Sequence, residues 1–73
     1  MIEVRLFATL RNGRQKVLHL DASSFSNGAE ILEHLRIPEE EVAIFLINGF
    51  HSKPVNEVKD GDILAIFPPV GGG

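Results

Sequence analysis

The reactive group that this sequence offers is the α-carboxylate of Gly73, which follows Gly71 and Gly72 at the end of the chain. A terminal carboxyl group has an ordinary pKa of about 3.5, so it is anionic and a poor electrophile at neutral pH. It must therefore be activated by an enzyme, for example as an acyl phosphate anhydride. Gly71 and Gly72 have no side chains, so they are suited to thread this carboxylate through a narrow channel into another protein.

A stem of two prolines, Pro68 and Pro69, precedes the glycines. Proline lacks a backbone N–H and fixes φ near −65°, so these residues cannot continue a sheet and predict a stiff, extended segment. From Pro69 to Gly73 an extended chain reaches at most about 17 Å. Terminal glycines alone are also typical of a frayed chain end, but the stem favours a functional tail. We therefore predict a folded domain at residues 1–67 and a flexible stem and tail at residues 68–73.

No other group of residues resembles a catalytic or metal site. His19, His34 and His51 have no metal-ligand spacing, and the chain has no cysteine. The run Glu39-Glu40-Glu41 follows a proline and is typical of a solvated turn or the start of a helix. No nucleophile stands beside an obvious base, and no Gly-Lys-Ser/Thr follows the glycines. We expect a chain that binds no metal or cofactor and is not itself an enzyme.

The composition indicates one small folded domain. The chain has 73 residues, of which 44% are hydrophobic and 23% are charged, and its net charge is −3. This balance is typical of a folded protein, and without a Lys/Arg cluster it does not favour a nucleic-acid partner. The sequence shows neither a signal peptide nor an apolar run of about 20 residues, so we expect a cytoplasmic protein without a membrane partner.

Apolar periodicity predicts the elements that hold this tail. Alternating apolar residues at 2–8 predict a first strand, and a continuous apolar run at 42–47 predicts a central one. Further strands are expected at 15–20 and 63–67, with a short edge piece at 51–55 that contains Pro54. Asn12-Gly13 lies between the first two strands and predicts a tight type I′ hairpin.

A single amphipathic helix is predicted between the second and third strands. Ala29, Ile31, Leu32 and Leu35 recur at helical spacing. The helix begins either at Asn27, where Glu30 would complete a capping box, or at Ser24. It ends near Arg36, because Pro38 disfavours helical geometry at the residue before it.

One helix covers one face of a sheet, so the other face must meet water or a partner. Phe7 alternates with Ile2, Val4 and Leu6 and is expected on this second face together with Phe67 and Leu46. Our hypothesis is that Phe7, Leu46 and Phe67, with Pro68 and Pro69 of the stem, dock a partner protein. The alternative is that the aromatic side chains complete a small second cluster under a loop.

Several segments resemble the MoaD/ThiS family of sulfur carriers, particularly the small subunit of molybdopterin synthase. The segment Ile66-Phe67-Pro68-Pro69-Val70-Gly71-Gly72-Gly73 resembles the end of that family, and its Phe-Pro-Pro-Val stem is the specific part. Leu6-Phe7-Ala8-Thr9-Leu10-Arg11 resembles the first-strand signature. Leu46-Ile47-Asn48-Gly49 and Lys59-Asp60-Gly61-Asp62 resemble the middle and the segment before the last strand.

This resemblance implies an α+β, ubiquitin-like β-grasp fold with a mixed four- to five-stranded sheet and one main helix on one face. It also implies that a MoeB/ThiF-like activating enzyme, using ATP and magnesium, adenylates Gly73. The carboxylate then becomes a thiocarboxylate, which donates sulfur within a larger synthase subunit in molybdopterin biosynthesis.

Three other functions remain open at the level of sequence. In the first, the sulfur goes to thiamine thiazole or amino-acid biosynthesis. The same Gly-Gly carboxylate would also serve a ubiquitin-like protein modifier that is conjugated to lysines. A non-covalent β-grasp interaction domain is the third alternative, and it predicts that removal of Gly72 and Gly73 has no effect.

Overall fold

Five strands form one mixed sheet in the order β2-β1-β5-β3-β4 in the computed structural model, which describes residues 1–69. The strands are β1 (Ile2–Leu6), β2 (Val17–Leu20), β3 (Ile44–Ile47), β4 (Phe50–His51) and β5 (Ile63–Phe67). The helices are α1 (Gly28–Leu35) and the short 3₁₀ turns η1 (Ala8–Arg11), η2 (Ala22–Ser24) and η3 (Glu39–Glu41). β1 and β5 are parallel, and the other three pairings are antiparallel. The predicted mixed sheet with one main helix is confirmed, and the arrangement is a β-grasp.

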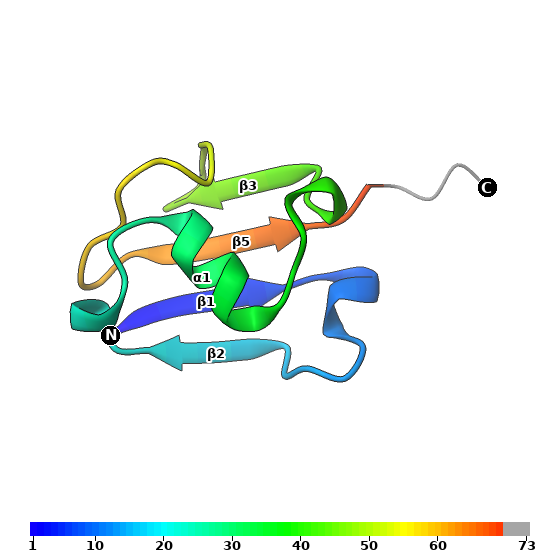
Figure 1. Cartoon of the computed structure of the whole chain (residues 1–73), viewed down its shortest axis with the longest axis horizontal. Coiled ribbons are helices and arrows are strands. Elements are labelled where there is room, and N and C mark those ends of the chain that lie inside the picture. Colours follow the sequence, from blue (N-terminus) through cyan, green and yellow to red (C-terminus); the bar gives the residue numbers. More distant parts are fainter. Residues whose placement is uncertain (70–73) are drawn as a thin grey trace.

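The core lies between this sheet and α1, which crosses the same face of β1 and β5 (Figure 1). Alternate residues of the two central strands face the helix and are fully buried, as period-2 alternation requires. Ile2, Val4 and Leu6 come from β1, and Leu64 and Ile66 come from β5. Burying an aliphatic side chain of this size stabilises the fold by about 1.5–3 kcal/mol. This shared core therefore holds β5 in place between β1 and β3.

Of the two starts that the sequence leaves open, α1 has the one capped by Asn27. The Asn27 side chain accepts a hydrogen bond from the Glu30 backbone N–H at 2.9 Å, and the Glu30 carboxylate accepts one from the Ser26 N–H at 2.6 Å. The alternative start at Ser24 is wrong, because residues 22–24 form the separate turn η2. The helix ends at Leu35, and Arg36 follows in a left-handed conformation with φ of 59°.

The predicted tight hairpin at Asn12-Gly13 is wrong. β1 ends at Leu6 rather than at residue 8, and η1 follows, because the Leu10 side chain turns into the core, where only 2% of it is exposed. Asn12 has φ of −64° and Gly13 has φ of 72°, which are the angles of a type II turn, and the Arg14 N–H donates to the Arg11 carbonyl at 2.9 Å. β2 consequently begins at residue 17 instead of residue 15.

The tight hairpin is formed instead by another Asn-Gly pair, Asn48-Gly49. Asn48 and Gly49 have φ of 52° and 83°, and they join β3 to β4, where Ile47 pairs with Phe50. Both positive φ values are those of a type I′ turn. β3 is one strand of this hairpin and pairs with β5 on its other side, so the predicted central strand is an interior strand, and β5 is the middle strand of the sheet.

Other strand boundaries differ by a few residues. β3 begins at residue 44 rather than 42, although the Ala43 N–H still donates to the Phe67 carbonyl at 2.8 Å. The predicted edge piece at 51–55 is β4 at Phe50–His51, and Pro54 lies in the loop beyond it. The predicted bounds of β5 are confirmed.

Candidate functional site

The stem leaves the sheet where β5 ends, between its two neighbouring strands. On one side the Phe7 N–H donates to the Ile66 carbonyl at 3.2 Å, and on the other the Ala43 N–H donates to the Phe67 carbonyl at 2.8 Å. Pro68 then has no N–H with which to continue the ladder. The chain is thus held on both sides up to Phe67, and Figure 1 shows it leaving beyond the end of the sheet.

The predicted reactive residue and its neighbours lie beyond this point. Gly73, with its predicted carboxylate chemistry, and Gly71 and Gly72, the predicted threading residues, lie outside the described residues. The predicted flexibility of the tail therefore stays a prediction.

Two aromatic rings stack at the root of the stem. The ring centroids of Phe7 and Phe67 are 4.2 Å apart, and the ring planes differ by 10°. The guanidinium of Arg11 lies 5.4 Å from the centroid of the Phe7 ring, and its Nε donates to the Leu6 carbonyl at 2.8 Å. The structure confirms that Phe7 faces away from the core residues of β1. It is half-buried rather than fully exposed, because Phe67 and Arg11 cover part of its ring.

The helix-free face of the sheet extends this stack into an apolar surface. Ile44 lies beside Phe67 in the sheet register, and Leu46 lies beside Ala65. Ile44 and Ile63 are 40% and 38% exposed, which are high values for β-branched aliphatic residues in strands. We call this surface the open face, and its members are Phe7, Ile44, Leu46, Ile63, Ala65 and Phe67. Sequence reasoning missed Ile44, Ile63 and Ala65, because their grouping depends on the pairing of β3 with β5.

Charged side chains occupy the other half of the same sheet face, on β1 and β2. Arg5 Nε donates to a Glu3 carboxylate oxygen at 2.5 Å, and His19 Nε2 lies 3.5 Å from the other oxygen. The hydrogen bond from Arg5, with a smaller effect from His19, holds the pKa of the Glu3 carboxyl below its ordinary value. The apolar part of the helix-free side therefore lies on β5 and β3, and the charged part lies on β1 and β2, where exposed Val17 pairs with Arg5.

A groove with a volume of about 600 Å³ lies on the other side of the stem, and we call it the stem groove. It is lined by Thr9, Leu10, Asn12, Arg14, Arg36, Pro38, Glu41, Pro68 and Pro69. Arg14 links two of the segments that line it, because the guanidinium donates to the carbonyls of Leu10, Leu35 and Arg36, each at 3.2 Å. The predicted partner-binding residues Pro68 and Pro69 thus form one wall of a groove as well as the start of the tail.

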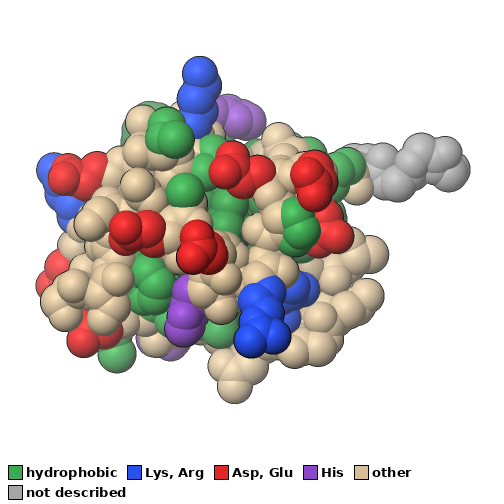
Figure 2. Space-filling view, in the orientation of Figure 1, with side chains coloured by type: hydrophobic (Ala, Val, Ile, Leu, Met, Phe, Trp, Pro, Cys, Tyr) green, Lys and Arg blue, Asp and Glu red, His purple; other side chains and the backbone are tan. Residues whose placement is uncertain are grey.

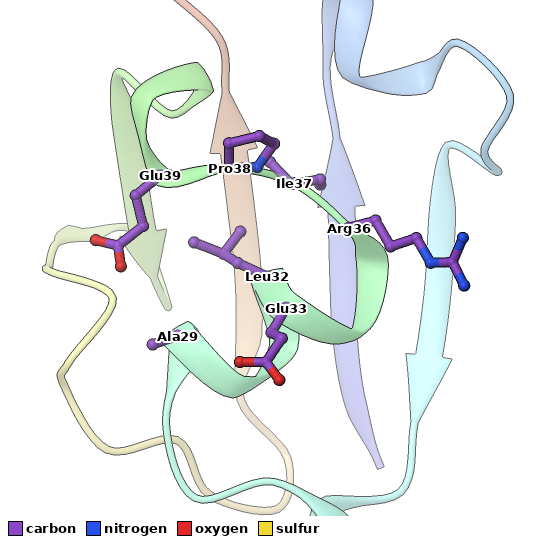
Figure 3. Close-up of a pocket in the computed structure, with 7 residues that line it drawn as sticks. All are labelled: Ala29, Leu32, Glu33, Arg36, Ile37, Pro38 and Glu39. Carbon is purple, nitrogen blue, oxygen red and sulfur yellow. The ribbon is translucent and has the colours of Figure 1, made fainter.

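A second hollow, of about 440 Å³, lies beside α1 (Figure 3). Its lining combines apolar residues such as Leu32 and Pro38 with the charged residues Glu33, Arg36 and Glu39. Figure 3 shows the charged ends of these three side chains pointing away from one another. They do not converge on a common point, so this hollow does not form a general acid–base pair.

The remaining candidates from the sequence lie apart from one another. His19 is on β2, His34 is on α1 and His51 is on β4. Among residues 1–69, no three His, Asp or Glu side chains are placed to hold a metal ion. Glu39, Glu40 and Glu41 form the exposed turn η3, which confirms the predicted solvated turn.

The surface and the helices add two observations. On the side that carries α1, Figure 2 shows acidic side chains spread over the surface and a group of Lys and Arg side chains at the lower right. Of the helices in the described part of the chain, none has the length and apolar character needed to cross a membrane.

Comparison with known proteins gives a family match and several similar structures. The model of the ThiS family matches residues 4–73. The crystal structure of SAMP1 from Haloferax volcanii is similar, with a TM-score of 0.74 and 25% identity over 99% of this chain and 98% of that one. No curated protein matches this chain.

Two further solved structures have the same fold. The solution structure of the Haloferax volcanii HVO 2177 protein has a TM-score of 0.71 and 28% identity, over 99% of this chain and 85% of that one. A complex of subunits 1 and 2 of the molybdopterin-converting factor from Helicobacter pylori contains a chain with a TM-score of 0.64 and 24% identity. That alignment covers 99% of this chain and 97% of the other.

Proposed function

This chain belongs to the ThiS family, and we propose that it carries sulfur on the carboxyl group of Gly73 for the biosynthesis of molybdopterin. The family consists of ubiquitin-fold sulfur carriers, which are small carrier proteins rather than catalysts. The observation that carries the proposal is that the family match extends through Gly73, on a fold whose middle strand leads directly into the stem. The Phe-Pro-Pro-Val stem supports molybdopterin over the other sulfur pathways.

The proposed chemistry divides between this chain and an activating enzyme. A Gly73 carboxylate oxygen attacks the α-phosphorus of ATP on the enzyme, which uses magnesium, and pyrophosphate leaves. A sulfide nucleophile then attacks the acyl carbon and AMP leaves, which gives the thiocarboxylate. The glycines supply a narrow chain that can enter the enzyme, and the folded domain supplies the surface by which the enzyme recognises its carrier.

The open face supports a role in this recognition. It is apolar, it lies at the root of the stem, and the extended chain from Pro69 to Gly73 reaches at most about 17 Å. A partner that covers Phe7 and Phe67 can therefore receive Gly73 within its own active site. We propose two partners for this surface in turn, the activating enzyme and a larger synthase subunit. The Helicobacter pylori complex of subunits 1 and 2 is an analogue of the second.

Intact mass tests the carrier chemistry directly. The chain is incubated with a candidate activating enzyme, ATP and a sulfur donor, and the C-terminal peptide should gain the mass difference between sulfur and oxygen. A chain lacking Gly72 and Gly73 is the control and should gain nothing, because its terminal carboxylate lies about 7 Å short of the position that Gly73 can reach. If no cognate activating enzyme produces the gain in the full chain, the carrier proposal fails. Transfer of the sulfur to a molybdopterin precursor, and not to a thiazole precursor, then tests the pathway.

Protein modification is the second candidate. It is favoured by the similarity to SAMP1, which is named small archaeal modifier protein 1. The same adenylated Gly73 would then form an isopeptide bond with a lysine Nζ of a target, with loss of AMP. This function predicts a ladder of conjugates in cells that disappears when Gly73 is deleted. A thiocarboxylate without conjugates would favour the carrier alone.

A further inference from the structure

Three Asn-Gly pairs occur in the chain, at residues 12–13, 27–28 and 48–49. In such a pair the glycine amide nitrogen can attack the asparagine side-chain amide carbon, because glycine has no side chain to hinder the approach. In a folded protein the reaction also requires an asparagine side chain that is free to turn and a peptide that is free to rotate. The three pairs differ in both respects.

The second pair is held at the start of α1. The Asn27 side chain accepts the Glu30 N–H at 2.9 Å, and the Gly28 N–H, which would be the attacking group, donates to the Asn56 carbonyl at 3.3 Å. Gly28 is also buried against the Phe45 ring. Both reacting groups of this pair are therefore engaged.

The third pair is held by its side chain. Asn48 Nδ2 donates to an Asp62 carboxylate oxygen at 2.9 Å, and its Oδ1 accepts the Ile63 N–H at 2.9 Å. The side-chain amide is thus fixed at both ends. It cannot approach the Gly49 nitrogen without losing these two hydrogen bonds.

The first pair has none of these restraints among residues 1–69. Asn12 is exposed, and neither its side chain nor the Gly13 N–H makes a hydrogen bond with a described residue. The peptide between them is the central peptide of a turn that is closed by the Arg14 N–H and the Arg11 carbonyl at 2.9 Å. This central peptide can rotate while the closing hydrogen bond remains.

We propose that Asn12 is a site of spontaneous deamidation in the folded protein and that the other two pairs are protected. The Gly13 nitrogen forms a bond to Asn12 Cγ, the bond from Cγ to Nδ2 breaks, and ammonia leaves with the proton of the Gly13 amide. Water then opens the five-membered imide at either carbonyl. The products are aspartate and isoaspartate at position 12, and no oxidant or reductant is required.

The product changes the surface beside the stem, because Asn12 lines the stem groove with Pro68 and Pro69. An aspartate there adds a negative charge at neutral pH to a groove wall that also contains Arg14 and Arg36. An isoaspartate in addition lengthens the backbone just before Arg14, the residue that ties this loop to the end of α1. The modification therefore alters both charge and geometry at the base of the tail.

Timed peptide mapping tests the proposal on the full, unmodified chain. The protein is kept at mildly alkaline pH, and the replacement of NH₂ by OH is measured by mass spectrometry on separate peptides for the three pairs. In the native protein Asn12 should react at least about tenfold faster than Asn48, since each of two hydrogen bonds must break at the latter. In urea the three pairs should react at similar rates, which shows that the fold causes the difference.

The matched variant is Asn12→Gln, which keeps a side-chain amide but would have to form a six-membered ring. It should release ammonia much more slowly in the native state, and the rates at Asn27 and Asn48 should not change. The proposal is overturned if Asn12 reacts no faster than the other two in the native wild-type chain. This experiment needs no partner protein, so its outcome is independent of the sulfur-carrier proposal.

Discussion

Truncation of the stacked ring at the root of the stem, Phe67→Ala, should weaken both the fold and the docking of partners. Replacing a fully buried Phe by Ala costs about 3–5 kcal/mol, so the half-buried Phe67 should cost about half of that, roughly 1.5–2.5 kcal/mol. Phe7→Ala should cost a similar amount. Because the rings are stacked at 4.2 Å, the double variant should lose about 0.5–1.5 kcal/mol less than the sum of the two single variants.

The effect on docking can be separated from the effect on stability. If Phe67 lies at the centre of the interface, its truncation should cost about 2 kcal/mol of binding free energy, or roughly 30-fold in Kd for the activating enzyme. Calorimetry on folded variants measures this, and the rate of thiocarboxylate formation at saturating carrier should change little. Deletion of Gly72 and Gly73 should do the reverse, because it draws the terminal carboxylate back by about 7 Å and leaves the open face intact.

Phe50→Ala is the matched control for both measurements. Phe50 is on the edge strand β4, away from the stack, and is 75% exposed, so its removal should change neither stability nor affinity by a comparable amount. Unchanged affinity of Phe7→Ala and Phe67→Ala, or an equal loss with Phe50→Ala, would refute docking through the open face.

Three further predictions concern the elements that support the site. Asn27→Ala should lose about 0.5–2 kcal/mol of unfolding free energy in urea, because it removes the N-cap of α1; an unchanged midpoint would contradict that role. Gly28→Ala should lower Tm, because an added Cβ would clash with Phe45 Cζ and overpacking costs about 1–3 kcal/mol. A raised Tm would show that the ring moves aside without cost. Glu3, whose pKa is held below its ordinary value of 4.5 chiefly by Arg5, should stabilise the fold above that pH and lose this contribution as the pH falls through its lowered pKa. Glu3→Gln should therefore reduce the acid-induced loss of unfolding free energy, and an identical pH profile would contradict the assignment.

Much of the fold follows from local patterns. Alternation in β1 and β5 separates core from open-face residues, because successive side chains in a strand point to opposite sides. The capping box of Asn27 and Glu30 was one of two predicted starts of α1, and it is made within four residues of sequence. These features depend on neighbours along the chain, so the sequence alone could predict them.

Asn12-Gly13 and Asn48-Gly49 show where such patterns fail. The same dipeptide forms a type II turn in the first case and joins a tight hairpin in the second. The difference arises from distant contacts, because Leu10 enters the core before the first turn, and Asn48 is held by Asp62 and Ile63 in the second. The turn propensity of an Asn-Gly dipeptide does not include the free energy of contacts with residues that are distant in the sequence.

The sequence by itself predicted the chemistry that we propose, because Gly73, with the glycines and prolines before it, is identified from residue types alone. Tertiary structure decided what stands beside that tail. Phe7 stacks on Phe67, and Ile44 joins them in the open face, because β5 pairs with β1 on one side and with β3 on the other. The register of these pairings depends on the free energy of burying the whole core, to which residues far apart in the chain contribute.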